Sequence, residues 1–263
     1  MGWNVVDPAV VTDDPAAPTQ YRYIGTHAWW LASFGAGTKQ YAYLGENIVR
    51  QWVPVDPQRE WLLDRQVTGH RVWLSGSPEQ ALAEGIGVTD GWPAGRWRAA
   101  YGDYYTSPGR KPTPRNGSWQ QPTTEFLAGL PREPRALYSR LEADSPQDRP
   151  GYVGAVVYAR DALRTGLVPA SMRAALYQAL LLVPGMVLED NAQNADGQPG
   201  IALVMDDGVY RIEIVIDPGT GQFIGERETL ASDNLDLSLA AGTVMQSTAV
   251  TTAIVGEIET LPA

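Results

Sequence analysis

The stretch VYRIEIVIDPGTGQFIGERETL, residues 209–230, carries the clearest fold signal in the chain. Its first half alternates apolar and charged side chains, with Arg211 and Glu213 between the apolar positions. Those apolar positions, which would share one face of a strand, are Tyr210, Ile212, Ile214 and Ile216. Such alternation predicts a half-buried strand. Residues 217–221 then supply Asp, Pro and Gly turn chemistry, so the stretch predicts a β-hairpin.

Further strands are predicted on both sides of this hairpin. They cover about 20–34, 41–54 and 59–75, the last broken at Thr68-Gly69, and then 201–205 and 242–258. Residues between them show helical spacing, with Leu137 and Leu141 four apart. Helices are predicted at about 123–130, 131–144, 151–167 and 170–183. The order strands, helices, strands predicts an α+β fold with a mainly antiparallel sheet and helices packed on one face.

The predicted organisation is a single domain preceded by a tail. Residues 1–19 are linker-like, because 7–19 are rich in Pro, Asp and Ala. The α+β domain covers 20–260. Its expected parts are N-terminal strands (20–76), an irregular Trp/Pro-rich insertion (77–122), helices (123–184) and C-terminal strands (185–260). Within the insertion, Ser77 is a candidate N-cap for a helical turn over 78–83.

Composition excludes several classes of function. The chain has no cysteine, so disulfide scaffolds, thiolate catalysis and iron–sulfur centres are excluded. Its formal net charge is −10, which argues against unaided binding to nucleic acid or to anionic lipid. Residues 1–122 carry 11 acidic and 11 basic side chains, so the excess negative charge lies in 123–263. No apolar run reaches the roughly 20 residues of a membrane helix, and the N-terminus lacks the regions of a signal peptide.

Motifs for catalysis and metal binding fail on spacing. The only histidines, His27 and His70, do not form a zinc-protease motif, and each is expected to be structural. Residues 190–197 suggest a calcium loop, but an EF-hand register places Ala192 first and Leu203 last, where it needs carboxylates. That segment is predicted to be a polar hairpin loop. We therefore predict no catalytic residue, no metal and no cofactor, although the many carboxylates leave an undetected hydrolase open.

Tryptophan is the distinctive residue of the N-terminal part. All nine tryptophans lie within residues 1–119. The candidate residues for ligand or partner binding are Trp29, Trp30, Trp52, Trp61 and Trp73. Two interpretations stay open, because tryptophan both anchors interfaces and fills cores. The strand register decides which side chains face outward, since a slip of one residue exchanges the two faces.

Several segments together resemble an uncharacterised family of actinobacterial cell-envelope proteins. They are YRYIGTHAW (21–29), QWVPVD (51–56), LPREPRALY (130–138), LRTGLVPA (163–170), LVPG (182–185), IDPGTGQFIGE (216–226) and STAVT (247–251). The resemblance covers about residues 20–258. It implies an extracytoplasmic domain joined to a membrane helix and a cytoplasmic segment, both missing here, and some members are encoded near extracytoplasmic-function sigma factors. The layout is also similar to the curved half-barrels of lipoprotein carriers and of anti-sigma-factor regulators.

Two functions follow as expectations. The first is a non-enzymatic extracytoplasmic sensor or interaction domain of the cell envelope, with a membrane-associated regulatory protein as partner. The alternative is a carrier that holds a lipid or another apolar small molecule between the sheet and the helices. Both place the chain outside the cytoplasmic membrane or secreted, with contact to the membrane only through the missing anchor and none to nucleic acid.

Overall fold

The computed structural model describes residues 11–36, 39–56, 58–88, 93–104, 116–145 and 151–262, with the side chains of 36, 39, 151 and 152 left aside. Fourteen elements lie in the described residues, nine strands and five helices. In chain order they are β1 (Tyr21–Ala36), β2 (Lys39–Pro54), β3 (Glu60–Ser75), α1 (Pro78–Ala83), β4 (Gly95–Ala100), α2 (Thr124–Ala128), α3 (Pro134–Asp144), α4 (Gly151–Arg164), α5 (Ala170–Leu180), β5 (Val187–Gln193), β6 (Pro199–Asp206), β7 (Tyr210–Ile216), β8 (Phe223–Leu230) and β9 (Val244–Val255).

One open, curved, antiparallel sheet contains every one of these strands, in the order β4-β3-β2-β1-β9-β8-β7-β6-β5. The first and last strands, β1 and β9, pair at its centre, from Tyr21 opposite Val255 to Trp30 opposite Gln246. Local hairpins build each half, and this one long-range pairing joins the halves. The fold is therefore α+β with a half-barrel-like sheet, as the sequence predicts.

The two faces of the sheet have different neighbours. The helix-side face carries Ile24, Leu203 and Ile214, which share a buried core with α3, α4 and α5. The opposite face carries Tyr23 and Trp52, which belong to a separate small core. Both faces are thus partly covered, and this explains the mixed polar and apolar pattern along β1 and β2.

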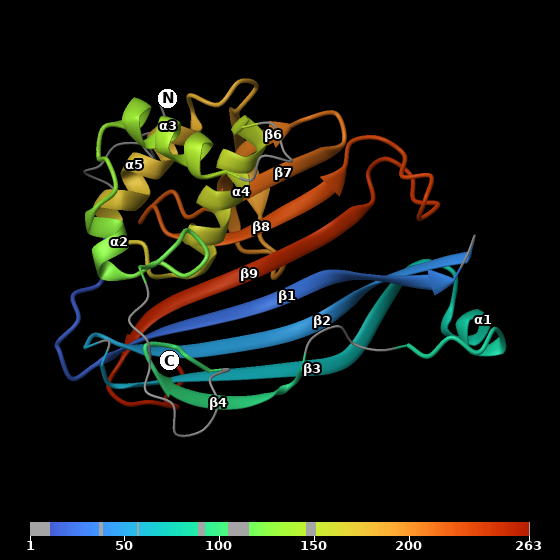
Figure 1. Cartoon of the computed structure of the whole chain (residues 1–263), viewed down its shortest axis with the longest axis horizontal. Coiled ribbons are helices and arrows are strands. Elements are labelled where there is room, and N and C mark those ends of the chain that lie inside the picture. The colour runs from blue at the N-terminus through green and yellow to red at the C-terminus, as the bar shows by residue number, and fades with distance from the viewer. Residues whose placement is uncertain are drawn as a thin grey trace.

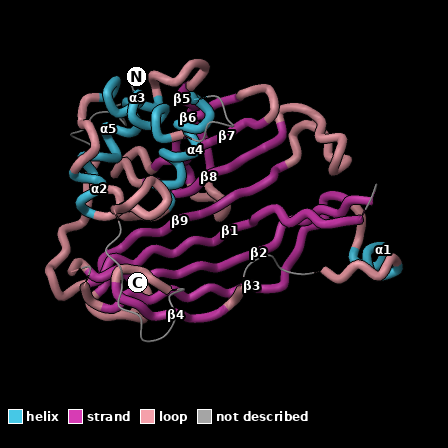
Figure 2. Tube along the Cα trace, viewed as in Figure 1, coloured by secondary structure: helices cyan, strands magenta, loops and turns pink. Residues whose placement is uncertain are grey.

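The helices cover only part of the helix-side face. Figures 1 and 2 show α2–α5 gathered over β5–β9 and the start of β1, while the rest of β1–β4 extends past them. The short helix α1 lies at the far tip, beside the ends of the long N-terminal strands. Its predicted cap is present, since Ser77 Oγ accepts from the Gln80 amide. The strands β1–β4 consequently expose more of their helix-side face than β5–β9 do.

Two strands differ from the sequence prediction. β4 lies inside 77–122, which was predicted to be irregular, and β5 includes residues 187–193, part of which was assigned to a loop. The segment GRWRAA of β4 has too little β-branched alternation to stand out, and it forms a strand because it pairs with β3. Parts of two predictions, the tail at 1–10 and the insertion at 89–92 and 105–115, lie outside the described residues.

Candidate functional site

The five predicted tryptophans do not form one surface. Trp52 pairs in register with Tyr23 and Leu62 on the opposite face, and Trp29 follows Tyr23 on that face by alternation. Trp30 alternates with Ile24 on the helix-side face, where Trp61 packs against the main core. The remaining one, Trp73, also lies on the helix-side face. Two of the five tryptophans therefore lie on the opposite face and three lie on the helix-side face.

Trp52 has a structural position. Its side chain is 2% exposed, stacks edge-on to Tyr23 at 5.4 Å between ring centroids, and contacts the buried Leu62. Its indole Nε1 donates to the Thr260 carbonyl oxygen at 2.7 Å, so the C-terminal segment closes over it. The interpretation of Trp52 as a binding residue therefore fails, because the ring fills a core.

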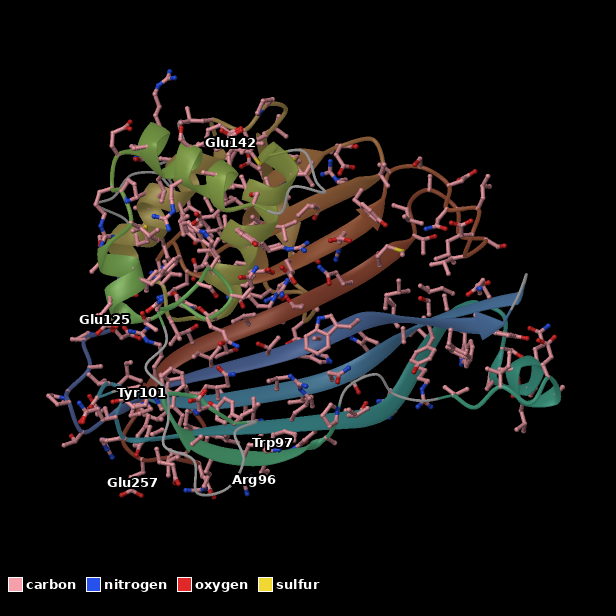
Figure 3. All side chains as sticks on the ribbon, viewed as in Figure 1. Arg96, Trp97, Tyr101, Glu125, Glu142 and Glu257 are labelled. Carbon is pink, nitrogen blue, oxygen red and sulfur yellow. The ribbon has the colours of Figure 1, made fainter. Side chains whose placement is uncertain are left out.

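The helix-side face of β1–β4 carries most of the accessible aromatic surface. Trp30, Trp61 and Trp73 are all half-buried there. A fourth ring, Trp97 of β4, joins them, since it is paired in register with Leu63, the neighbour of Trp61 on that face. We call Trp30, Trp61, Trp73 and Trp97 the tryptophan face. Figure 3 labels Trp97 and Arg96 on β4, with Arg96 at the outer edge of the sheet.

An aromatic cluster fixes one end of the tryptophan face. The ring of Trp73 lies 5.3 Å from that of Tyr43 and 6.1 Å from that of Phe34, measured between centroids. Phe34 also stacks on Tyr41 at 5.5 Å. Gly45 leaves room for the Tyr43 ring, which would stand 3.2 Å from an added Cβ. The orientation of Trp73 is therefore set by packing rather than left free.

A histidine–carboxylate cluster occupies the opposite face of the same strands. His27 of β1 lies between two carboxylates, with its Nδ1 2.5 Å from Asp196 Oδ1 and its Nε2 2.9 Å from Glu46 Oε1. His70 of β3 reaches the other oxygen of Glu46 through Nδ1 at 2.8 Å, and Thr68 Oγ1 donates to the same oxygen at 2.6 Å. We call His27, Glu46, His70, Thr68 and Asp196 the histidine cluster.

Local backbone irregularities bring this cluster together. The pairing of β2 with β3 shifts by two residues between Gly45 opposite Arg71 and Asn47 opposite Val67. Residues 68–70 therefore all face Glu46, and Gly69 takes a φ of +85° that favours glycine. The predicted break at Thr68-Gly69 is thus a bulge, and it lets Thr68 and His70 share one carboxylate.

Electrostatics favour charged forms within the cluster. Burial by itself would lower the pKa of His27, but hydrogen bonds with Asp196 and Glu46 outweigh it and raise that pKa above its usual value. The hydrogen bond from Thr68, followed by those from His27 and His70, lowers the pKa of Glu46 despite its desolvation. Both shifts stabilise an ion pair between His27 and Glu46.

A second charged group is buried between α4 and the sheet. Glu226 of β8 has no exposed surface, and its Oε1 accepts from Arg164 Nη2 at 2.6 Å. Arg160 Nε lies 3.4 Å from Glu226 Oε2, and Arg160 Nη1 donates to Glu228 at 2.7 Å. We call Arg160, Arg164, Glu226 and Glu228 the ionic network. It fixes how α4 sits on the sheet.

The layer between helices and sheet is filled by side chains. Leu176 of α5, Leu137 of α3 and Ile214 of β7 are each fully buried there. Two cavities, of about 230 and 240 Å³, lie elsewhere, one in the loop after β8 and one between residues 12–14 and the turn of the β7–β8 hairpin. No helix residue lines either cavity. The carrier hypothesis predicts an apolar cavity in that layer, and neither of these two is one.

Sequence reasoning missed Trp97 and the histidine cluster for different reasons. Trp97 lies in β4, and the composition of that segment does not indicate a strand. For His27, the signal lies in the register of the first two strands, which pairs Trp29 with Glu46 and places His27 diagonally beside that glutamate. The contribution of Asp196, 169 residues away, has no local signal.

The described residues offer neither a metal-binding group nor a membrane-spanning helix. Among the described residues, no group of three or more His, Cys, Asp or Glu side chains could hold a metal ion, and the histidine cluster uses its ring nitrogens on carboxylates instead. Within the same ranges, no helix combines the length and the apolar character needed to cross a membrane. The chain matches no protein-family model, no curated protein and no solved structure.

Proposed function

We propose that this chain is a non-enzymatic extracytoplasmic interaction or sensor domain of a cell-envelope protein, and that it binds a protein partner on the tryptophan face. Placement outside the membrane, and a link to sigma-factor regulation, rest on the family resemblance of its sequence. The binding role rests on the position of the tryptophans.

The observation that carries the proposal is the gathering of four half-buried tryptophans on one face of three strands. They come from β1, β3 and β4. Helices α2–α5 leave most of this face uncovered (Figure 1). A tryptophan that is partly exposed keeps apolar area for a partner, and such residues dominate interface energetics.

The shape of the face favours an extended partner. Trp73 is paired with Tyr43, and Leu62, the neighbour of Trp61, is paired with Trp52, so Trp61 and Trp73 lie about 30 Å apart along the sheet. Trp97 stands on β4, the edge strand of the sheet. A partner segment lying along β3 and β4 would contact several rings in turn, whereas a small ligand would reach only one or two.

Site-specific photocrosslinking tests the proposal. A photoreactive phenylalanine analogue replaces Trp97 in one variant and Trp29 in a control variant, and both are expressed in the envelope of an actinobacterial host. Trp29 is a suitable control because it is half-buried like Trp97 but lies on the opposite face. We expect one protein adduct at position 97 and none at position 29.

Affinity for the crosslinked protein then completes the test. Trp97→Ala should weaken binding of the purified partner by about 30-fold, as for a hot-spot residue, and Trp29→Ala should leave it unchanged. Equal adducts at both positions, or equal affinities, would contradict the proposal. An adduct in the mass range of a lipid would instead favour the carrier.

A further inference from the structure

The geometry around His27 requires two donors on one imidazole ring. Each ring nitrogen faces a carboxylate oxygen, Asp196 at 2.5 Å and Glu46 at 2.9 Å, and an ionised carboxylate only accepts hydrogen bonds. A neutral imidazole has one N–H and can satisfy only one of the two. The contacts are therefore those of the imidazolium form, and loss of its proton forces one carboxylate to separate.

The two carboxylates differ in how firmly they are held. Glu46 lies within the sheet, its side chain is 15% exposed, and it keeps Thr68 and His70 as further donors. Asp196 stands on the β5–β6 loop, residues 194–198, and its side chain is 54% exposed. Asp196 is thus the carboxylate that separates when His27 becomes neutral.

The β5–β6 loop crosses the opposite face to reach β1. At its base, Asn194 Nδ2 donates to the Ile224 carbonyl oxygen at 2.9 Å, and the Ala195 amide donates to the Thr248 carbonyl oxygen at 3.1 Å. Gly225 permits this approach, since an added Cβ would meet Asn194 Cβ at 2.8 Å. The contact of Asp196 with His27 is the outermost attachment, so its loss frees the tip first.

No other charged group on the neighbouring elements replaces Asp196 or Glu46 as a partner of His27. On β9 the residues paired with His27 and Trp29 are Ala249 and Ser247. On the same face, β2 carries Arg50, which lies 3.6 Å from Asp64 of β3, and β8 carries Arg227, which is paired in register with Ser247. The other arginines that register places on this face, Arg96 and Arg98 of β4 and Arg211 of β7, belong to strands further from β1. Beyond these, the cluster contains only His70, which contacts Glu46.

We propose that His27 is a pH-dependent latch, which holds the β5–β6 loop against β1 when protonated and releases its tip when neutral. The switch joins the two halves of the sheet, because His27 belongs to β1 and the loop to the β5–β6 hairpin. This inference stands apart from the tryptophan face, which lies on the other side of the sheet.

Nuclear magnetic resonance titration of the whole chain tests the latch. The chain has only two histidines, so the ring protons give two sets of signals, and His70→Gln identifies the set from His27. We expect the His27 ring and the backbone amides of Ala195 and Asp196 to titrate with one shared midpoint. Above it, exchange protection of the Ala195 amide, corrected for the intrinsic pH dependence, should fall.

Two variants separate the latch from a structural role. Asp196→Asn, at an exposed position, should lower the His27 midpoint and abolish the step in the amide of Ala195. His27→Gln should abolish the same step, and His70→Gln should retain it. The latch is wrong if the amides of 195 and 196 show no step at the His27 midpoint, or if their step persists in either Asp196→Asn or His27→Gln.

Discussion

A single buried ring shows how composition alone misleads about tryptophan. Trp52 was a candidate binding residue, yet it lies under the C-terminal segment with its N–H bonded to Thr260. Trp29, which shares its face, remains half-buried. Trp52 packs against Tyr23 and Leu62 and is covered by the C-terminal end of the chain.

Replacing these two rings should therefore have unequal effects on stability. Trp52→Ala should lower the free energy of unfolding by about 3–5 kcal/mol, because it opens a cavity and leaves a carbonyl unpaired. Trp29→Ala should lower it by less, since part of that ring already contacts solvent. Urea unfolding followed by circular dichroism measures both. Equal losses would show that Trp29 is buried as deeply as Trp52.

The histidine cluster also predicts how stability depends on pH. His27 has a pKa raised above 6.5, so its contribution is complete below 6.5 and is lost as the pH rises through the raised value. Glu46 has a pKa lowered from 4.5, so its contribution is complete above 4.5 and is lost as the pH falls through the lowered value. The cluster should stabilise the fold most between these limits.

Comparison of two variants checks this window. The difference in unfolding free energy between the natural chain and His27→Gln should be larger at pH 5.5 than at pH 9. Since the side chain of His27 is 30% exposed, added salt should reduce the difference. A difference that does not change with pH would mean that His27 contributes through packing alone.

At the scale of elements, the ionic network fixes helix α4 on strand β8. Arg160 is 8% exposed and Glu226 is fully buried, so neither charge is well solvated. Burial by itself would lower the pKa of Arg160, but the charges of Glu226 and Glu228 outweigh it and raise that pKa. Such groups stabilise a structure only as a complete set, because each one desolvated without its partner is costly.

Removing one charge from the network should have a large effect. Glu226→Gln should destabilise the chain by about 3–5 kcal/mol, because Arg160 and Arg164 both lose a buried carboxylate partner. Glu189→Gln is the matched control, since Glu189 pairs with Arg211 on the surface and is 44% exposed. Its effect should stay below about 1 kcal/mol. Similar losses in the two variants would show that water reaches Glu226.

An element can be predicted from the sequence when the residues that determine it are close together in the chain. Hairpins such as β7–β8 have their pattern and their turn within 22 residues, and the sequence predicted them. The helix α1 was predicted from Ser77 as its cap. β4 was not, because only its pairing with β3 makes GRWRAA a strand. The sequence identified the tryptophans, but only the strand register shows which face of the sheet each one occupies. The histidine cluster could not be predicted, because Asp196 reaches it from a loop in the other half of the sheet.

At the scale of the whole molecule, the ten paired residues of β1 and β9 join the halves of the sheet. The tryptophans of β1–β4 report on one half, while Trp119 and the helices α3–α5 report on the other. We expect tryptophan fluorescence and helical circular dichroism to give the same midpoint in urea, because neither half has a complete sheet alone. An earlier fluorescence transition would show that β1–β4 unfold independently.

The central pairing of β1 with β9 also sets an order of events during synthesis. The edge of β1 that receives β9 has to wait until residues 244–255 have left the ribosome, more than 200 residues after β1 itself. Until then an unpaired edge of about ten residues is open to other chains. The nascent protein therefore depends on slow, long-range closure of its sheet, and a chaperone that covers β1 during translation would raise its yield.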